Sequence, residues 1–399
     1  MRELPAESEP PTDGGGHPLA PTSAISGSPP EGAVNGPRSR DPRGPPRGLA
    51  PTPSAGWEID CGLIDAFSFR CRPDCGLCCF ATPSVTPPER ERLLQILPEL
   101  SWESDPHAIP ARPDGGACQY LADVRCRVHV DRPFPCAEFP VSVHLGPRAQ
   151  ASVVLSCPGL SLEPLESWVD APRSATGLGL ENEVATVRGE MGRVPEPERR
   201  RIEREWARAA RRAGFPPDSA GLDRLRSEVR SAFPSPSLAN VLESPLPEES
   251  EGLETLPLFF DPTYGRVALA GAGEEVDLLS IREGGGVERR IASFGWPERL
   301  PRCVGPAARL LRGYLEYVLD RDALFGAVMV GGALGTAEGA VGAVRRDLTE
   351  IGGTVLARSY WRAQLAGGLG ESLSIHEVAA GIRATDADYL DRPTAGRWL

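Results

Sequence analysis

The spacing of apolar residues changes along the chain and separates a tail, a strand-forming region and a helical region. Residues 1–55 hold few apolar positions and many Pro, Gly and Ser residues, so no core can form and we expect a disordered arm. Further along, apolar residues alternate with a period of two in four runs bounded by turns: 256–260, 266–270, 276–282 and 287–294. This period is typical of half-buried strands and predicts a short antiparallel meander.

Helical spacing begins at about Val304 and continues towards the C-terminus. One predicted helix face carries four apolar residues, spaced by one, four and three positions: Leu310, Leu311, Leu315 and Val318. Residues 323–344 are almost uncharged and long enough to cross a bilayer, but their many glycines are more typical of closely packed helices. We therefore expect two core helices that meet near Gly335 and Thr336, rather than a membrane span.

Two sequences of the form Ser/Thr-x-x-Glu predict capping boxes at the start of further helices. Thr86 and Glu89 precede a short helix that should end near Leu97, because Pro98 follows it. Ser374 and Glu377 should begin the last helix.

Charge excludes one class of partner. The net charge is −12 and every basic residue is arginine, so the chain as a whole should repel nucleic acid. Residues 198–212 are a local exception with seven arginines, and their apolar stripe consists of Ile202, Trp206, Ala209 and Ala213. Because glutamates stand four residues from several of these arginines, we expect a solvated helix, with binding of RNA or an acidic partner as the alternative.

Cysteine is the most informative residue type in this chain. Eight of the ten cysteines lie in one stretch: Cys71, Cys75, Cys78, Cys79, Cys118, Cys126, Cys136 and Cys157. The N-terminal residues lack a basic stretch followed by an apolar core, so we expect a cytoplasmic protein whose thiols stay reduced. Adjacent cysteines such as Cys78 and Cys79 also pair with each other only under severe strain. Both points favour metal ligands over disulfides.

The number and spacing of the thiols suggest the kind of metal site. In a helix or tight turn, Cys71, Cys75 and one of the next two cysteines share a face, and Gly76 allows a sharp bend. Eight thiolates divide into two four-cysteine sites, either tetrathiolate zinc or iron–sulfur. Neighbouring arginines would favour the thiolate form: Arg70, Arg72, Arg125, Arg127 and Arg132.

Simpler interpretations of these residues remain open. One structural zinc could hold a loop-rich region together while the spare cysteines are merely buried. His129 lies within ligand reach of Cys126, although a packing or supporting role is the commoner one for such a histidine. Cys61 and Cys303 are isolated, so we expect buried free thiols there.

Several blocks in this stretch together resemble one known family. They are Cys71-x3-Cys75-x2-Cys78-Cys79, Cys118-Gln-Tyr-Leu, Cys126-Arg-Val-His, Arg132-Pro-x2-Cys136-x2-Phe139-Pro140 and Cys157-Pro-Gly. Their order is similar to that in the YkgJ-type cysteine-cluster family, described as a zinc- or iron-chelating domain, and the resemblance spans about residues 65–160. It implies metal binding by the eight cysteines, without supplying a reaction. Two positions depart from the family pattern, because Phe80 and Ala137 stand where a basic residue is common.

Two enzyme classes are alternatives to a binding protein. The spacing Cys71-x3-Cys75-x2-Cys78 is also that of radical S-adenosylmethionine enzymes, but the regular strand and helix alternation of that fold is not evident after Cys79. The resemblance also allows an iron–sulfur-dependent methyl-transfer or redox enzyme, since some relatives of the domain are protein lysine methylases. No glycine-rich cofactor loop after a strand supports that class here.

These observations combine into one prediction for the whole chain. The fold class is α+β, with a loop-rich cysteine-cluster metal domain, a short antiparallel meander and a mostly helical C-terminal region. The expected divisions are a disordered arm at 1–55, the metal domain at 56–165, a helical segment and linker at 166–255, and meander plus helical bundle at 256–399. We expect a metal-binding protein that carries an iron–sulfur cluster or zinc, with the C-terminal helices as the candidate surface for a protein partner.

Overall fold

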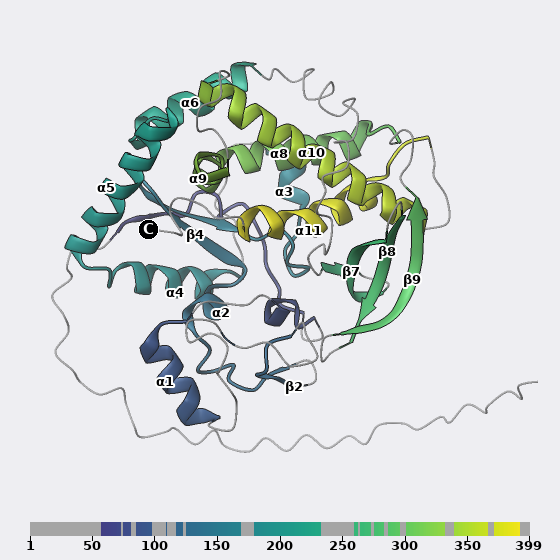
Figure 1. Cartoon of the computed structure of the whole chain (residues 1–399), viewed down its shortest axis with the longest axis horizontal. Helices are drawn as coiled ribbons and strands as arrows, with labels where there is room; N and C mark the ends of the chain where they lie inside the picture. The colour runs from purple at the N-terminus through teal and green to yellow at the C-terminus, as the bar shows by residue number, and fades with distance from the viewer. Residues whose placement is uncertain are drawn as a thin grey trace, which may run out of the picture. The chain divides into compact units, whose positions relative to one another are not determined.

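The computed structural model describes residues 57–72, 75–80, 85–97, 109, 117–122, 125–168, 179–232, 259–261, 264–272, 275–282, 286–295, 301–331, 339–365 and 371–391. All of them belong to the unit Thr52–Leu399, and the arm predicted for residues 1–55 lies outside the described residues. The fold is α+β, as predicted, with helices, a small mixed sheet, a hairpin and an antiparallel meander (Figure 1).

A three-stranded sheet lies next to the cysteine-bearing segments. Its order is β1-β5-β4, with the bounds β1 Ile59–Asp60, β4 Val141–Leu145 and β5 Ala149–Val153. Strand β5 is buried along its whole length and runs parallel to β1 and antiparallel to β4. The short β-branched run at residues 152–156 predicts a strand there, but β5 begins earlier because the turn at Gly146–Arg148 pairs it with β4 from Ala149 onward.

Short elements lie among the clustered cysteines and carry four of them. They are the 3₁₀ helix η1 Leu77–Phe80, helix α1 Pro87–Ile96, the hairpin strands β2 Leu121–Ala122 and β3 Arg125–Cys126, and helix α2 Phe134–Glu138. The predicted capping box of α1 is confirmed, because the backbone N–H and the hydroxyl of Thr86 both donate to a Glu89 carboxylate oxygen at 2.8 Å. The other oxygen of Glu89 accepts the N–H of Phe134 at 2.7 Å, which joins α1 to α2.

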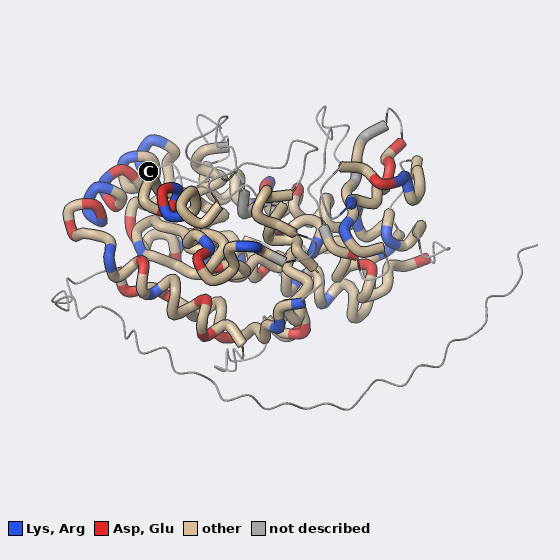
Figure 2. Tube along the Cα trace, turned by 90° about the horizontal axis from the view of Figure 1, so that it is seen from below, with Lys and Arg blue, Asp and Glu red and all other residues tan. Residues whose placement is uncertain are grey.

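In the described residues, the helices that connect the cysteine-bearing part to the C-terminal half are α3 Glu163–Glu166, α4 Glu181–Met191, α5 Glu196–Ala213 and α6 Ser219–Ala232. Helix α5 buries Ile202, Trp206 and Ala213 as predicted, although Ala210 rather than Ala209 completes the buried stripe. Its arginines pair along the helix, with Arg201 at 2.8 Å from Glu205. Acidic and basic residues are interspersed rather than gathered on one face (Figure 2), which agrees with a solvated helix.

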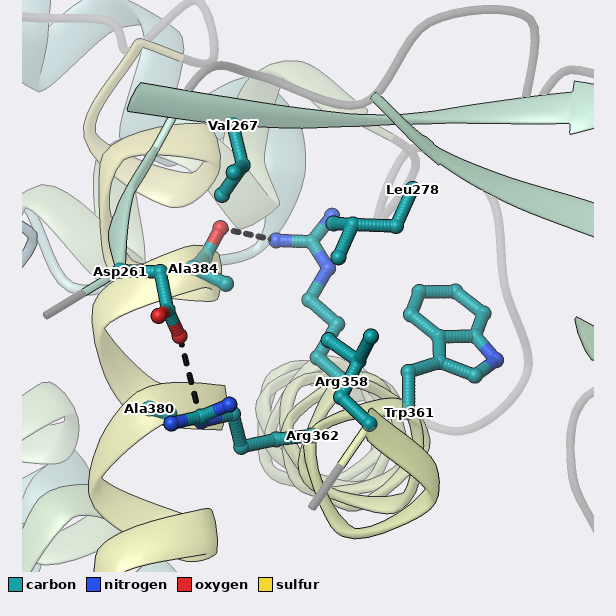
Figure 3. A pocket seen from close by; sticks show the side chains of 9 residues that line it. Asp261, Val267, Leu278, Arg358, Trp361, Arg362, Ala380 and Ala384 are labelled. Atoms are coloured by element: carbon teal, nitrogen blue, oxygen red, sulfur yellow. Dashed lines mark hydrogen bonds and ion pairs between the residues drawn. The ribbon is translucent and has the colours of Figure 1, made fainter. Parts of the chain in front are cut away.

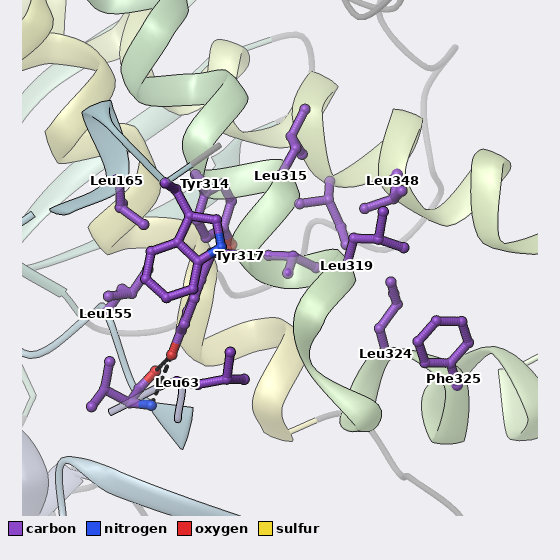
Figure 4. Close-up of a cluster of buried hydrophobic side chains, with 14 of the residues drawn as sticks. Leu63, Leu155, Leu165, Tyr314, Leu315, Tyr317, Leu319, Leu324, Phe325 and Leu348 are labelled. Carbon is purple, nitrogen blue, oxygen red and sulfur yellow. Dashed lines mark hydrogen bonds between the residues drawn. The ribbon is translucent and has the colours of Figure 1, made fainter. Parts of the chain in front are cut away.

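The largest core forms around the C-terminal helices α8 Gly305–Asp320, α9 Asp322–Gly331, α10 Gly339–Leu365 and α11 Ile375–Asp391. Leu310, Leu311, Leu315 and Val318 are buried together, as predicted, and Figure 4 shows Leu315 among the aromatic and aliphatic side chains of this core. The predicted capping box also forms at the start of α11. The junction expected near Gly335 lies outside the described residues, and no helix in the described part is long and apolar enough to span a membrane.

The meander is confirmed as a four-stranded antiparallel sheet, β6 Phe259–Asp261, β7 Gly265–Ala272, β8 Glu275–Ile281 and β9 Val287–Gly295. One face of it packs on α10 and α11, where Arg362 forms an ion pair with Asp261 at 3.1 Å and Arg358 donates to the carbonyl of Ala384 (Figure 3). The cavity between these residues measures only about 10 Å³, which is room for about one water molecule.

Side chains from the C-terminal helices reach directly into the N-terminal sheet. Arg321 donates to the carbonyl of Val153 at 2.6 Å, and the Tyr317 hydroxyl bonds both backbone groups of that residue. One continuous apolar core consequently extends from Trp57 to Ile382. The division expected at residue 165 remains a prediction, and the contacts just described cross it.

Candidate metal centre

The first four of the eight clustered cysteines lie on a loop that turns tightly at Gly76. Gly76 has a φ of +58°, a conformation that a side chain would strain, and η1 follows it at once. The N–H of Cys79 donates to the carbonyl of Gly76 at 3.0 Å, which closes this turn. The thiols alternate in exposure, because Cys71 and Cys78 are exposed while Cys75 is buried.

The hairpin and α2 bring three further cysteines to the same place. Cys118, Cys126 and Cys136 are half-buried and pack together against a small apolar cluster that contains Tyr120 and Val128. The N–H of Cys118 donates to the carbonyl of Cys79 at 2.6 Å. This bond ties the hairpin to the double cysteine across a gap of almost 40 positions in the sequence.

Cys157 arrives from the end of β5 and is buried. Phe69 forms a β-bridge with Leu160, and the N–H of Arg70 donates to the carbonyl of Gly159 at 2.9 Å. A Cβ atom on Gly159 would lie 2.6 Å from the carbonyl oxygen of Arg70, so only glycine permits this approach. The pairing brings Cys157 to the beginning of the loop that carries Cys71.

A common backbone turn presents four of the thiols. The sulfur of Cys75 accepts the N–H of Leu77 at 3.4 Å, and the sulfur of Cys118 accepts the N–H of Tyr120 at the same distance. Cys126 and Cys157 each accept the N–H of the residue two positions on in the same way. Hydrogen bonds to sulfur stabilise the thiolate, which is the form that binds metal.

Cys78 is the electrostatic centre of the group. Its charge acts on the pKa of each of the other seven: Cys71, Cys75, Cys79, Cys118, Cys126, Cys136 and Cys157. A hydrogen bond with Cys79 lowers the pKa of Cys78 to about 7, and the nearby Arg132 guanidinium acts in the same direction. The same hydrogen bond, together with burial, raises the pKa of Cys79.

Burial is the first cause of a raised pKa at the remaining six thiols, and repulsion between neighbouring sulfurs adds to it. The pKa rises to about 11 at Cys75 and Cys118 and to about 12 at Cys157, and it is also raised at Cys71, Cys126 and Cys136. A thiophilic cation would remove this cost by neutralising the thiolates. The donor set therefore fits zinc or an iron–sulfur cluster.

Arginines from distant segments surround the cysteines, and sequence reasoning missed most of them. Arg132, which the sequence analysis singled out, favours the thiolates of Cys71, Cys78, Cys126 and Cys136. Arg266 of β7 lies 5.3 Å from the centre of the Phe80 ring, so a basic group reaches a position where the sequence has an aromatic residue. Arg383 of α11 favours the thiolate of Cys157.

The eight thiols lie near one another, but they are not arranged as a metal site. Among the described residues, no group of three or more His, Cys, Asp or Glu side chains is arranged to hold a metal ion. His129 is exposed, so the packing role considered for it is not seen. Cys61 is buried and Cys303 is half-buried, and neither shows an interaction with another cysteine. Binding of metal would therefore have to draw the eight thiols closer, and it would be coupled to local folding.

Comparison with known proteins gives one match, and it also indicates metal binding. Residues 70–158 match a family model, CxxCxxCC, whose description reads "Putative zinc- or iron-chelating domain". The match contains all eight cysteines of the group and supports chelation of zinc or iron. No curated protein and no solved structure matches the chain.

Proposed function

We propose that the eight cysteines bind metal as two groups of four thiolates. The first group is Cys79, Cys118, Cys126 and Cys136, and the second is Cys71, Cys75, Cys78 and Cys157. The observation that carries the proposal is the convergence of eight thiols from separate elements around the double cysteine, while Cys61 and Cys303 stay apart.

Contacts within each group support this division. In the first group, the N–H of Cys118 bonds to the carbonyl of Cys79. The side chains of Cys118, Cys126 and Cys136 pack against one apolar cluster. In the second, the backbone pairing between residues 69–70 and 159–160 brings the segments of Cys71 and Cys157 together. The adjacent residues Cys78 and Cys79 would then serve different groups, so the hydrogen bond between their thiols would have to break when metal binds.

The number of ligands favours iron–sulfur over a single structural zinc. One structural zinc uses four thiolates, whereas eight provide for two clusters or for a cluster and a zinc. Backbone N–H groups directed at sulfur also suit a cluster, because such hydrogen bonds tune its reduction potential. A bound cluster would supply one-electron transfer, and the chain's own contribution would be to hold the thiolates and shield the first group.

A redox enzyme is the second candidate, and the exposure of Cys71 and Cys78 favours it. These thiols would leave one edge of the second group open to a reaction partner. The radical S-adenosylmethionine alternative has less support. After Cys79, the described residues form a helix, a hairpin, a second short helix and two antiparallel strands, without the regular strand and helix alternation that such a fold uses.

Purification without oxygen tests the proposal. We expect iron and acid-labile sulfide in the protein, with broad absorption at roughly 400 nm from thiolate-to-iron charge transfer. Single Cys→Ser changes in either group should lower metal content, whereas Cys61→Ser and Cys303→Ser serve as matched controls that should not. A colourless protein that holds only zinc would refute the iron–sulfur part. Equal loss of metal in Cys303→Ser and Cys75→Ser would refute the assignment of ligands.

A further inference from the structure

The segment that carries Cys157 is held in place by the last helix of the fold. Helix α11 begins more than 200 residues after Cys157 and lies outside the part of the chain that matches the metal-binding family. Two of its side chains, Arg383 and Asp386, nevertheless bond to the backbone between Leu155 and Leu160.

Arg383 bonds to three carbonyl groups at once. Its guanidinium donates to the carbonyl of Cys157 at 2.5 Å, of Leu160 at 2.7 Å and of Leu155 at 3.3 Å. The three carbonyls belong to the turn in which the sulfur of Cys157 accepts a backbone N–H. A planar guanidinium can make these bonds from one position because its donors form a rigid fork, which a lysine ammonium cannot reproduce.

A second residue of α11 holds the same segment through buried polar groups. The Asp386 carboxylate is fully buried and accepts the N–H of Leu155 at 2.6 Å, and it pairs with Arg321 at 2.7 Å. Two parts of the chain thus hold Cys157 in position. One is helix α11, and the other is the segment before Cys71, where the N–H of Arg70 bonds to the carbonyl of Gly159. Removal of either support would release a ligand rather than the whole centre.

We propose that Arg383 is a positioning residue of the metal centre, which holds the backbone of Cys157 so that its thiol meets the ligands from the Cys71–Cys79 loop. The inference rests on the proposed metal binding. It makes the C-terminal helix part of the site, so the matched segment alone would bind metal with one poorly placed ligand. Side chains that position metal ligands commonly contribute about 10–100-fold in metal affinity.

The test compares two arginines in the full-length, metal-loaded protein: Arg383, which is half-buried, and Arg358, which is buried. Arg383→Gln removes the three bonds to the Cys157 turn. Arg358→Gln is the matched control, because Arg358 is a buried arginine of α10 that donates to the carbonyl of Ala384, next to Arg383 in sequence. The readouts are iodoacetamide labelling of each cysteine by mass spectrometry and the thiolate-to-metal charge-transfer band after loading with cobalt(II).

We expect Cys157 to be shielded from iodoacetamide in the wild-type protein and in Arg358→Gln. In Arg383→Gln it should be labelled, with affinity lower by about 10–100-fold and a cobalt band reduced by the share of one thiolate. Equal labelling of Cys157 in both variants would mean that general packing is responsible and would overturn the inference. So would full shielding of Cys157 in Arg383→Gln.

Two further outcomes are decisive. If Arg383→Gln does not fold, Arg383→Lys replaces it. Intermediate labelling of Cys157 then supports the inference, and shielding equal to wild type overturns it. If the wild-type protein binds no metal and shields no cysteine, the proposed function fails and takes the positioning role with it. Wild-type binding combined with a shielded Cys157 in the variant overturns the positioning role alone.

Discussion

The helical half and the cysteine-bearing half of this protein are stabilised in different ways. Around α8, Tyr314, Tyr317 and Phe325 are fully buried in a large apolar core (Figure 4). Beside the thiols, the apolar clusters are small, one of them containing only Cys75, Leu77 and Phe260. Small apolar clusters provide little free energy of folding, and metal–thiolate bonds commonly take their place. The comparison predicts that the helical half is stable by itself and that the segments around the thiols depend on a ligand.

Removal of metal should separate the two halves most clearly. Chelation should unfold the segments around Cys118 and Cys136 and leave α8 and α10 folded, because structural metal can contribute on the order of 10 kcal/mol to such regions. Hydrogen–deuterium exchange of the loaded and the chelated protein gives the answer residue by residue. If the hairpin kept its protection after complete removal of metal, the cysteine-bearing half would be self-sufficient and the comparison would fail.

A pH series should affect the loaded and the metal-free protein in opposite directions. In the metal-free protein, burial raises the pKa of Cys75 from 9 to about 11. Between these two pH values the thiol stays protonated in the folded protein, whereas it ionises in the unfolded chain. Its contribution to stability is complete below about pH 9 and is lost as the pH rises towards 11. Denaturant unfolding at pH 8 and pH 10.5 should show this loss.

Metal-loaded protein should instead lose its ligand as the pH falls. The thiols with raised pKa values must release protons when metal binds, so apparent affinity should fall by up to about tenfold per pH unit for each proton displaced. Competition with a chromogenic chelator between pH 6 and pH 8 measures this slope. A flat profile would show that the thiols with raised pKa values are not ligands.

A change in the helical half should lower stability without affecting metal. Arg226→Gln removes a charged partner of the buried Asp322 carboxylate, with which Arg226 forms an ion pair at 2.7 Å, and breaking a buried pair commonly costs about 3–5 kcal/mol. Denaturant unfolding should detect the loss, while the metal content of the folded protein stays at the wild-type level. A variant that lost metal before it lost stability would show that the two halves are not separable in this way.

The smallest effect is expected at the surface of α5. Arg201→Ala removes ion pairs with Glu198 and Glu205, which lie at the solvent-exposed surface and should contribute little to the free energy of unfolding. Thermal unfolding should therefore be almost unchanged, and metal content should not change at all. A large loss of stability here would contradict the description of α5 as a solvated helix.

Local patterns in the sequence predicted much of this fold because their physical causes are local. Thr86 with Glu89 and Ser374 with Glu377 do form capping boxes, since each box lies within four residues. The meander follows from alternation within each strand. The early start of β5 was missed, because it depends on pairing with β4 rather than on the residues of β5 themselves.

The surroundings of the thiols were harder to predict. The residues two positions after Cys75, Cys118 and Cys157 are Leu, Tyr and Gly, so no side-chain pattern marks the backbone turn that they share. Arg266 and Arg383 come from elements that meet the cysteines only in the folded chain. Clustering in the sequence predicts the eight-cysteine group, and both its role as a set of ligands and its division into two sites remain predictions.

The contact between Arg383 and the Cys157 turn also has a consequence for the order of events during protein synthesis. Cys157 leaves the ribosome long before Arg383 is made. At about 5–20 residues per second, the ~200 residues between them take on the order of 10–40 s. During that interval the thiols are present without the side chain that aligns one of them. Metal delivered to the nascent chain would meet an incomplete centre, so productive loading is expected after translation of α11.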